Sequence, residues 1–182
     1  MSGHSKWSQI KRKKALTDAK KGRLFSKLSK IIELAAKKGV DPKTNLVLKK
    51  AVDQAKVENM PVANIERAIK KGSGAGADGS QMEEIIYEAY GPGGAALLIK
   101  SVTDNKNRAT AEIKHILSQH GANLSGAGSV KWLFASVVED GEIKWRPKQT
   151  IKLSLDDDDK LSALLSDLDD QDDVSDVYTN VE

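Results

Sequence analysis

The stretch from Glu84 to Val102 reads EIIYEAYGPGGAALLIKSV, and it decides the fold class. Apolar residues recur in Glu84–Tyr90 with a period close to two, a glycine-rich turn occupies Gly91–Gly94, and Ala95–Val102 has a continuous apolar centre. A period of two is typical of a strand that is buried on one face, and a continuous apolar run is typical of a buried strand. The stretch therefore predicts two strands joined by a short turn.

The residues that follow predict further helices and strands. In chain order they are a helix capped by Asp104 or Asn105 and ending at Gly121, strands at 129–138 and 143–153 around a turn at 139–141, a helix at 156–168, and a strand at 174–181. Pro147 favours an edge position for the strand region that contains it. Without the strand at 84–90 the order is β-α-β-β-α-β, which predicts an α+β fold with a ferredoxin-like sheet and one extra strand.

The part of the chain before this stretch predicts a small helical bundle. Apolar residues at steps of three and four indicate helices at 17–38, 41–57 and 61–72, and Asp41-Pro42 is a typical start for the second. The run Gly72–Ser80 reads GSGAGADGS, which is the composition of a flexible connector. We therefore expect a helical domain at 1–72, a linker at 73–81 and an α+β domain at 82–182. The linker also spells G-x-G-x-x-G, but it lacks the strand before and the helix after it that a dinucleotide site needs.

Charge is distributed very unevenly over a chain whose net charge is only +3. Residues 1–72 hold 19 basic and 6 acidic residues, whereas residues 73–182 hold 10 and 20. A strongly basic segment attracts polyanions by releasing their counterions, so the N-terminal part is expected to bind nucleic acid. The alternative is that the lysine-rich surface serves solubility.

The candidate nucleic-acid contacts lie in the first thirty residues. They are the basic residues Lys6, Lys11, Arg12, Lys13, Lys14, Lys20, Lys21, Arg23 and Lys27, together with Trp7. A tryptophan before a basic run can stack on an exposed base, and it can equally anchor the arm on its own bundle. The sequence leaves both roles open for Trp7.

No constellation for catalysis or metal binding is found. The chain has no cysteine, which excludes disulfides, thiolate zinc sites and a cysteine nucleophile. His115 and His120 stand five residues apart, so they do not share a helix face. The acidic run from Leu153 to Glu182 lacks the spacing of a calcium loop and is expected to form a solvated edge that repels nucleic acid. We expect no enzymatic activity, no cofactor, no metal, no small-molecule substrate, no membrane contact and a cytoplasmic location.

Four motifs resemble those of one family. Gly3–Trp7 reads GHSKW, Tyr87–Gly94 reads YEAYGPGG, Thr103–Arg108 reads TDNKNR and Gly128–Val130 reads GSV. Together they resemble the YebC family, which includes the mitochondrial translational activator of cytochrome oxidase subunit one. The resemblance implies a helical N-terminal domain followed by α+β domains, and a non-enzymatic role in gene expression. It implies either a ribosome-associated translation factor that binds rRNA or tRNA and helps synthesis through difficult stretches such as consecutive prolines, or a transcriptional regulator that binds duplex DNA.

The resemblance also implies which positions matter. The matched residues are His4, Lys6 and Trp7 in the arm, Tyr90, Gly91, Pro92, Gly93 and Gly94 in the turn, and Asp104, Asn105, Asn107 and Arg108 after the second strand. The alternatives are that the glycines only supply positive φ angles and that Asp104 or Asn105 only caps a helix. Arg108 is expected to contact phosphate or a partner, because the dipole does not favour an arginine in a first helical turn. Longer members carry an inserted α/β domain where this chain has only the surroundings of residues 139–141, so we expect a short form.

Overall fold

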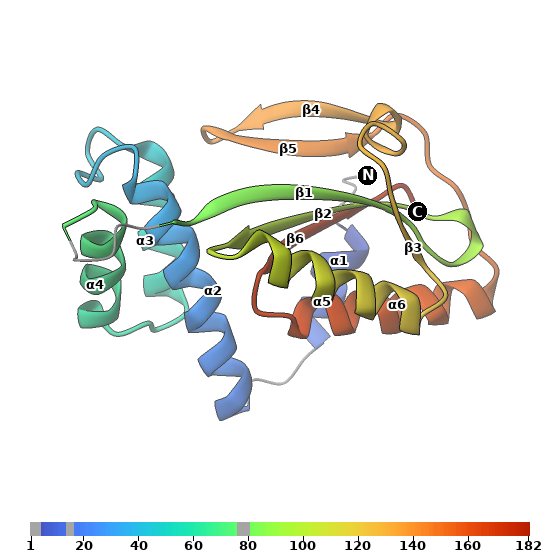
Figure 1. Cartoon of the computed structure of the whole chain (residues 1–182), viewed down its shortest axis with the longest axis horizontal. Coiled ribbons are helices and arrows are strands. Elements are labelled where there is room, and N and C mark those ends of the chain that lie inside the picture. The colour runs from blue at the N-terminus through green and yellow to red at the C-terminus, as the bar shows by residue number, and fades with distance from the viewer. Residues whose placement is uncertain (1–4, 14–16, 76–80) are drawn as a thin grey trace.

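Three helices pack side by side at one end of the molecule (Figure 1). The computed structural model describes residues 5–13, 17–75 and 81–182, and of Ser5, Arg12 and Lys13 it describes the backbone alone. The three helices are α2 (Asp18–Ala36), α3 (Leu46–Val57) and α4 (Val62–Gly72). Their common core contains Leu28, Ile32, Leu48 and Ile65, all of them buried. This is the predicted three-helix arrangement. The predicted linker at 73–81 falls partly on residues 76–80, outside the described residues, and stays a prediction.

The second of these helices begins later than predicted. Asn45, not Asp41, caps α3, because its side chain accepts a hydrogen bond from the Leu48 N–H at 3.0 Å. Its amide group also donates to the carbonyl oxygens of Ala35 and Gly39. Asp41 instead accepts from the Lys43 N–H in a turn. The buried Asn45 thus ties the end of α2 to the start of α3.

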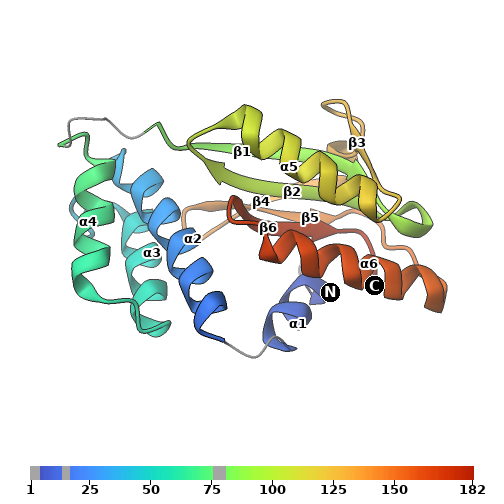
Figure 2. The ribbon, with the colours of Figure 1, turned by 60° about the horizontal axis from the view of Figure 1, so that its bottom comes forward.

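The main sheet within the described residues has four antiparallel strands. They are β1 (Glu83–Tyr90), β2 (Ala96–Thr103), β3 (Asn123–Ser125) and β6 (Val174–Thr179), in the order β3-β1-β2-β6. The helices α5 (Lys106–Gln119) and α6 (Leu155–Asp170) cover one face of this sheet, as Figure 2 shows. The α+β class predicted from the sequence is confirmed.

The place of the first strand in the sheet differs from the predicted arrangement. Both β2 and β3 run antiparallel to β1, so they are parallel to each other with β1 between them. Together with α5 they form a split βαβ unit, the building block of the ferredoxin-like prediction. The strand that the prediction set aside as extra is therefore central.

Two of the expected strands do not join the main sheet. They are β4 (Phe134–Glu139) and β5 (Glu142–Pro147), which pair only with each other. Phe134 and Trp145 pack on the sheet face that the helices leave open, where they meet Leu98 and Tyr178. A strand that is apolar on both faces, as β2 is, needs cover on both sides. The hairpin supplies the second cover, which is why it forms a separate layer.

The N-terminal arm is helical. Helix α1 (Ser5–Lys13) contacts α6 and β6. The basic N-terminal helix therefore lies against the acidic part of the chain (Figure 2).

Candidate nucleic-acid interface

Trp7 belongs to α1, and its side chain is buried. Only 2% of the residue is exposed, and it belongs to the core cluster of the main sheet and its helices. The Lys11 ammonium lies 5.2 Å from the centroid of the indole ring. Base stacking needs an open ring face, so the stacking role does not fit this arrangement. The anchoring role fits, although the anchor point is the α+β part and not the helical bundle.

Four cations of α1 and α2 meet carboxylates at the other end of the sequence. The pairs are Lys6 with Asp158, Arg23 with Asp170 at 3.3 Å, Lys27 with Asp169 at 3.8 Å, and Lys30 with Asp173 at 2.5 Å. We call these eight residues the charge seam. The sequence predicted that the acidic run forms a solvated edge. Part of the run instead pairs with the basic helices and neutralises them. Lys6 and Lys27, whose side chains are largely buried, are consequently engaged within the chain, whereas Arg23 stays about half exposed and its phosphate contact stays a prediction.

Lys27 is the most deeply buried cation of the charge seam. Its ammonium also donates to the main-chain oxygen of Asp169. Burial lowers the pKa of Lys27 from 10.5 to about 8, although the charge of Asp169 opposes the shift. Keeping Lys27 charged in the folded protein therefore costs free energy. This cost is absent once the lysine has lost its proton.

We expect the stability of the protein to rise between about pH 8 and pH 10 because of Lys27. In this range the folded chain has released the proton while the unfolded chain still holds it, so the contribution rises with pH by at most about 1.4 kcal/mol per pH unit. Urea denaturation of the wild type and of Lys27→Met at pH 7.5, 8.5 and 9.5 checks this. The exposed Lys21→Met is the control and should follow the wild type. Parallel pH curves for Lys27→Met and the wild type would contradict the assignment.

Arg108 is part of a second ionic cluster. Its guanidinium donates to Asp104 at 2.8 Å and to Asp173 at 3.2 Å, and Asp173 also accepts from Lys30. Burial alone would raise the pKa of Asp173, but Lys30 and Arg108 together lower it below the ordinary value. The predicted phosphate contact of Arg108 is thus occupied by carboxylates of the same chain. Asn105 caps α5 by accepting from the Arg108 N–H at 3.1 Å, as the alternative predicted, and Asn107 is exposed.

The glycine turn packs against the start of α6. Gly93 and Gly94 have φ angles of 63° and 77°, which side chains rarely adopt. A Cβ atom on Gly93 would meet the Leu153 side chain at 2.7 Å. Pro92 is buried, and Gly91 lies against side chains of β2 and α6. Backbone geometry and packing therefore account for the turn, apart from Tyr90, which is 38% exposed.

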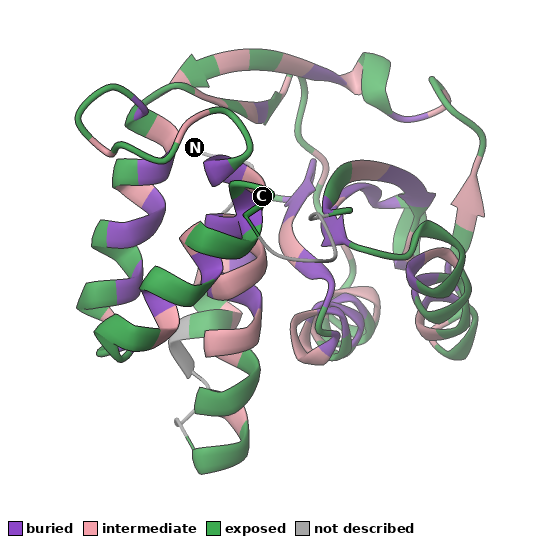
Figure 3. Ribbon diagram, turned by 60° about the vertical axis from the view of Figure 1, so that its left-hand side comes forward, coloured by how far each residue is buried: buried purple, intermediate pink, exposed green. Residues whose placement is uncertain are grey.

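A set of cations on the bundle remains without carboxylate partners. Among the described residues, no ion pair involves Lys20 and Lys21 of α2, Lys49 and Lys56 of α3, or Arg67 and Lys70 of α4. We call these six residues the free cations. Figure 3 shows that the outward faces of these helices are largely exposed. Of the other predicted contacts, His4, Lys14 and the side chains of Arg12 and Lys13 lie outside the described residues.

Glu88 has a role that sequence reasoning missed. Its carboxylate accepts backbone N–H groups of Gly128 at 2.6 Å and of Val130 and Lys131 at 2.7 Å each. Burial would raise the pKa of Glu88, but these hydrogen bonds lower it below the ordinary value. The signal in the sequence was a carboxylate between Ile86 and Tyr90 on one face of a strand. Glu88 fixes the GSV loop against the sheet.

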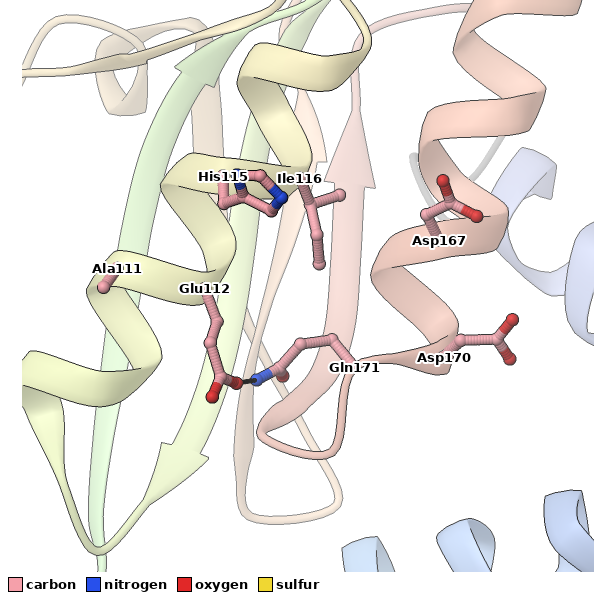
Figure 4. Close-up of a pocket in the computed structure, with 7 residues that line it drawn as sticks. All are labelled: Ala111, Glu112, His115, Ile116, Asp167, Asp170 and Gln171. Atoms are coloured by element: carbon pink, nitrogen blue, oxygen red, sulfur yellow. Dashed lines mark hydrogen bonds between the residues drawn. The ribbon is translucent and has the colours of Figure 1, made fainter.

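A groove lies between α5 and α6. Its volume is about 440 Å³, and it is lined by Ala111, Glu112, His115, Ile116, Asp167, Asp170 and Gln171 (Figure 4). The Gln171 amide donates to Glu112 at 2.7 Å, and Asp167 lies 2.7 Å from the His120 ring nitrogen. Within the described part of the chain no three His, Asp or Glu side chains are placed to hold a metal ion.

Comparison with known families covers nearly the whole chain. The model of the TACO1/YebC protein N-terminal domain matches residues 5–75, and the model of the TACO1/YebC second and third domain matches residues 82–137 and 135–181. The chain belongs to the TACO1/YebC family. The two matches to the second and third domain meet within β4, close to the place where the sequence indicated a missing insertion.

Relatives of this TACO1/YebC chain carry regulatory names. A probable transcriptional regulatory protein of Thermoanaerobacter pseudethanolicus is 40% identical over 240 aligned positions, which cover 100% of this chain and 97% of the relative. Because this chain has 182 residues, the relative holds residues without a counterpart here. A second such protein, from Syntrophus aciditrophicus, is 54% identical over 147 residues, covering 79% of this chain and 59% of the relative.

One solved structure has the same fold. The crystal structure of a conserved hypothetical protein from Aquifex aeolicus matches with a TM-score of 0.86 and 35% identity, covering 98% of this chain and 97% of the other. None of the helices in the described ranges is long and apolar enough to cross a membrane.

Proposed function

We propose that this TACO1/YebC protein is a nucleic-acid-binding regulator that acts in translation, with its helical bundle on the phosphate backbone of rRNA or tRNA. The observation that carries the proposal is the set of free cations on α2, α3 and α4. Phosphate contacts require positive charge and no base reading, and they supply most of the affinity in such complexes. In line with the family resemblance, we propose that it helps ribosomes through difficult stretches such as consecutive prolines.

The exposed residues of the bundle favour contacts with the phosphate backbone of a nucleic acid over hydrogen bonds to the base edges of duplex DNA. A recognition helix presents side chains such as Arg, Asn or Gln near its N-terminus to the edges of bases. The first turn of α4 exposes Val62 and Ala63, and the first turn of α3 exposes Leu46 and Lys49. Three of these four exposed residues are apolar and cannot donate hydrogen bonds to bases, and Asn64 in the first turn of α4 is half-buried.

The direct test is cosedimentation of the full chain with ribosomes at rising salt. We expect the protein to sediment with ribosomes at low salt and to leave them as salt increases, because counterions compete for the phosphates. A protein that stays in the free fraction even at low salt would refute the proposal.

The double variant Lys20→Ala/Lys21→Ala should bind ribosomes more weakly than the wild type. Each phosphate contact that is lost should flatten the slope of log affinity against log salt by up to about 0.9. The matched control is Lys106→Ala/Lys114→Ala, which removes two exposed lysines of α5 instead. An unchanged slope in the first variant would remove the start of α2 from the interface.

The second candidate function is transcriptional regulation on duplex DNA, and the names of the curated relatives favour it. Crosslinking of the tagged protein in its own cells, followed by sequencing of bound RNA and DNA, separates the two functions. Recovery of rRNA or tRNA from one ribosomal site supports translation. Enrichment of promoter DNA without rRNA supports the regulator and refutes the translation proposal.

A further inference from the structure

Trp132 differs from the two other tryptophans of the chain. Trp7 and Trp145 are buried, whereas 64% of Trp132 is exposed. It lies in the short 3₁₀ helix η2 (Lys131–Leu133), directly before β4, at the end of the hairpin that is remote from the helical bundle (Figure 1). Single exposed apolar side chains are common on protein surfaces, so a binding role for this ring depends on the groups that lie beside it.

The ring of Trp132 is held in place by hydrogen bonds. Its Nε1–H donates to the carbonyl oxygen of Ser129 at 2.9 Å, and its own carbonyl oxygen accepts from the Lys148 ammonium at 2.8 Å. The loop below it is fixed by the three N–H groups that Glu88 accepts. A ring that is already immobilised loses little entropy when it binds a ligand.

A second aromatic ring lies beside Trp132. The Tyr90 hydroxyl donates to the same Ser129 carbonyl oxygen at 3.0 Å, so the polar edges of the two rings meet at one atom. Tyr90 is the exposed member of the glycine-turn motif, which packing did not explain. The shared acceptor links the YEAYGPGG and GSV motifs at one surface.

The same surface is positively charged. Lys131 and Lys148 are exposed, and among the described residues neither forms an ion pair with a carboxylate. The Lys131 ammonium lies over the buried Trp145 ring, 4.9 Å from its centroid. Exposed aromatic rings next to lysines are the combination with which proteins bind single-stranded nucleic acid, because bases stack on the rings and phosphates meet the cations.

We infer that Trp132, Tyr90, Lys131 and Lys148 form a site for an unpaired nucleotide. The base stacks on Trp132 beside Tyr90, and the flanking phosphate meets Lys148. The site rests on the proposed nucleic-acid binding, and it adds a contact surface separate from the free cations. It favours single strands, because a base inside a duplex cannot reach the ring.

The test uses the full chain and fluorescein-labelled 12-nucleotide probes: an unstructured RNA, the same RNA annealed to its complement, and the DNA of the same sequence. Trp132→Ala should weaken binding of the single strands about 5- to 100-fold and leave duplex affinity within about twofold. Trp132→Phe, which keeps a ring, should recover most of the affinity. Val138→Ala, at an exposed apolar residue of β4, is the control. Lys148→Ala should flatten the single-strand salt slope by about 0.7.

Tryptophan fluorescence gives a readout that needs no variant. Because the other two tryptophans are buried, binding of the RNA should protect Trp132 from quenching by acrylamide. Stronger binding of RNA than of DNA would identify RNA as the ligand, and equal binding would extend the site to both. Wild-type affinity of Trp132→Ala for single strands, or an equal loss for the duplex, would overturn this site alone. A wild-type chain that binds no probe at low salt would overturn the proposed function as well.

Discussion

Trp7→Ala should lower the free energy of unfolding by about 3 to 5 kcal/mol, the usual cost of replacing a buried tryptophan by alanine. The ring fills the space between α1 and the sheet core, and a cavity there leaves α1 with few other apolar contacts. We therefore expect α1 to detach in this variant. Urea denaturation measures the loss, and faster amide exchange at residues 5–13 locates it.

The control for Trp7→Ala is Trp132→Ala, which removes the same side chain from an exposed position. Its stability should stay within about 1 kcal/mol of the wild type. Equal stabilities for wild type and Trp7→Ala, combined with a large loss of RNA affinity, would restore the base-stacking role that the burial of Trp7 argues against.

Asp173→Asn should lower the free energy of unfolding by about 3 kcal/mol. Asp173 is 2% exposed, and its carboxylate is the common partner of Lys30 on α2 and Arg108 on α5. Removing the Asp173 charge leaves the half-buried Lys30 without its carboxylate partner, which is costly, whereas Arg108 keeps Asp104. Chemical denaturation at pH 7 measures the effect.

The same residue gives a dependence on pH. Because the folded pKa of Asp173 is lowered, its contribution is complete above the ordinary pKa of about 3.9 and is lost as the pH falls through the lowered value. The variant should lack this part of the acid destabilisation. Asp156→Asn is the control, since Asp156 and Lys160 form an exposed ion pair that contributes little to stability. Equal losses in the two variants would contradict the burial argument.

Local patterns were sufficient to predict most helices and strands. The cap at Asn105 and the apolar period of α2 depend on residues within a few positions, which a single sequence displays. The start of α3 was misplaced because Asp41 and Asn45 are both good caps, and the choice depends on the bonds of Asn45 to the end of α2.

The layers and the site depended on contacts between distant residues. The apolar run of β2 indicated burial on both faces, but nothing local to it could show that the β4–β5 hairpin covers one of them. The sequence displays the basic residues of α1 and α2, but their partners stand more than a hundred residues away, as with Lys27 and Asp169. The sequence around Trp132 does not show that its ring is exposed, because exposure is a property of the folded chain.

The hairpin also restricts how the two parts of the molecule can turn against each other. At its tip, Lys50 of α3 lies 2.9 Å from Glu142 and 3.7 Å from Asp140. The charge seam holds α2 from Arg23 to Lys30, over about 10 Å of helix, while the hairpin holds α3 from the opposite face of the sheet. Attachments that do not lie on one line oppose rotation of the bundle on the sheet, so in the folded chain these contacts, and not only the glycine-rich connector, fix the spacing between the free cations and Trp132. A single nucleic acid that contacts both surfaces must therefore span this spacing.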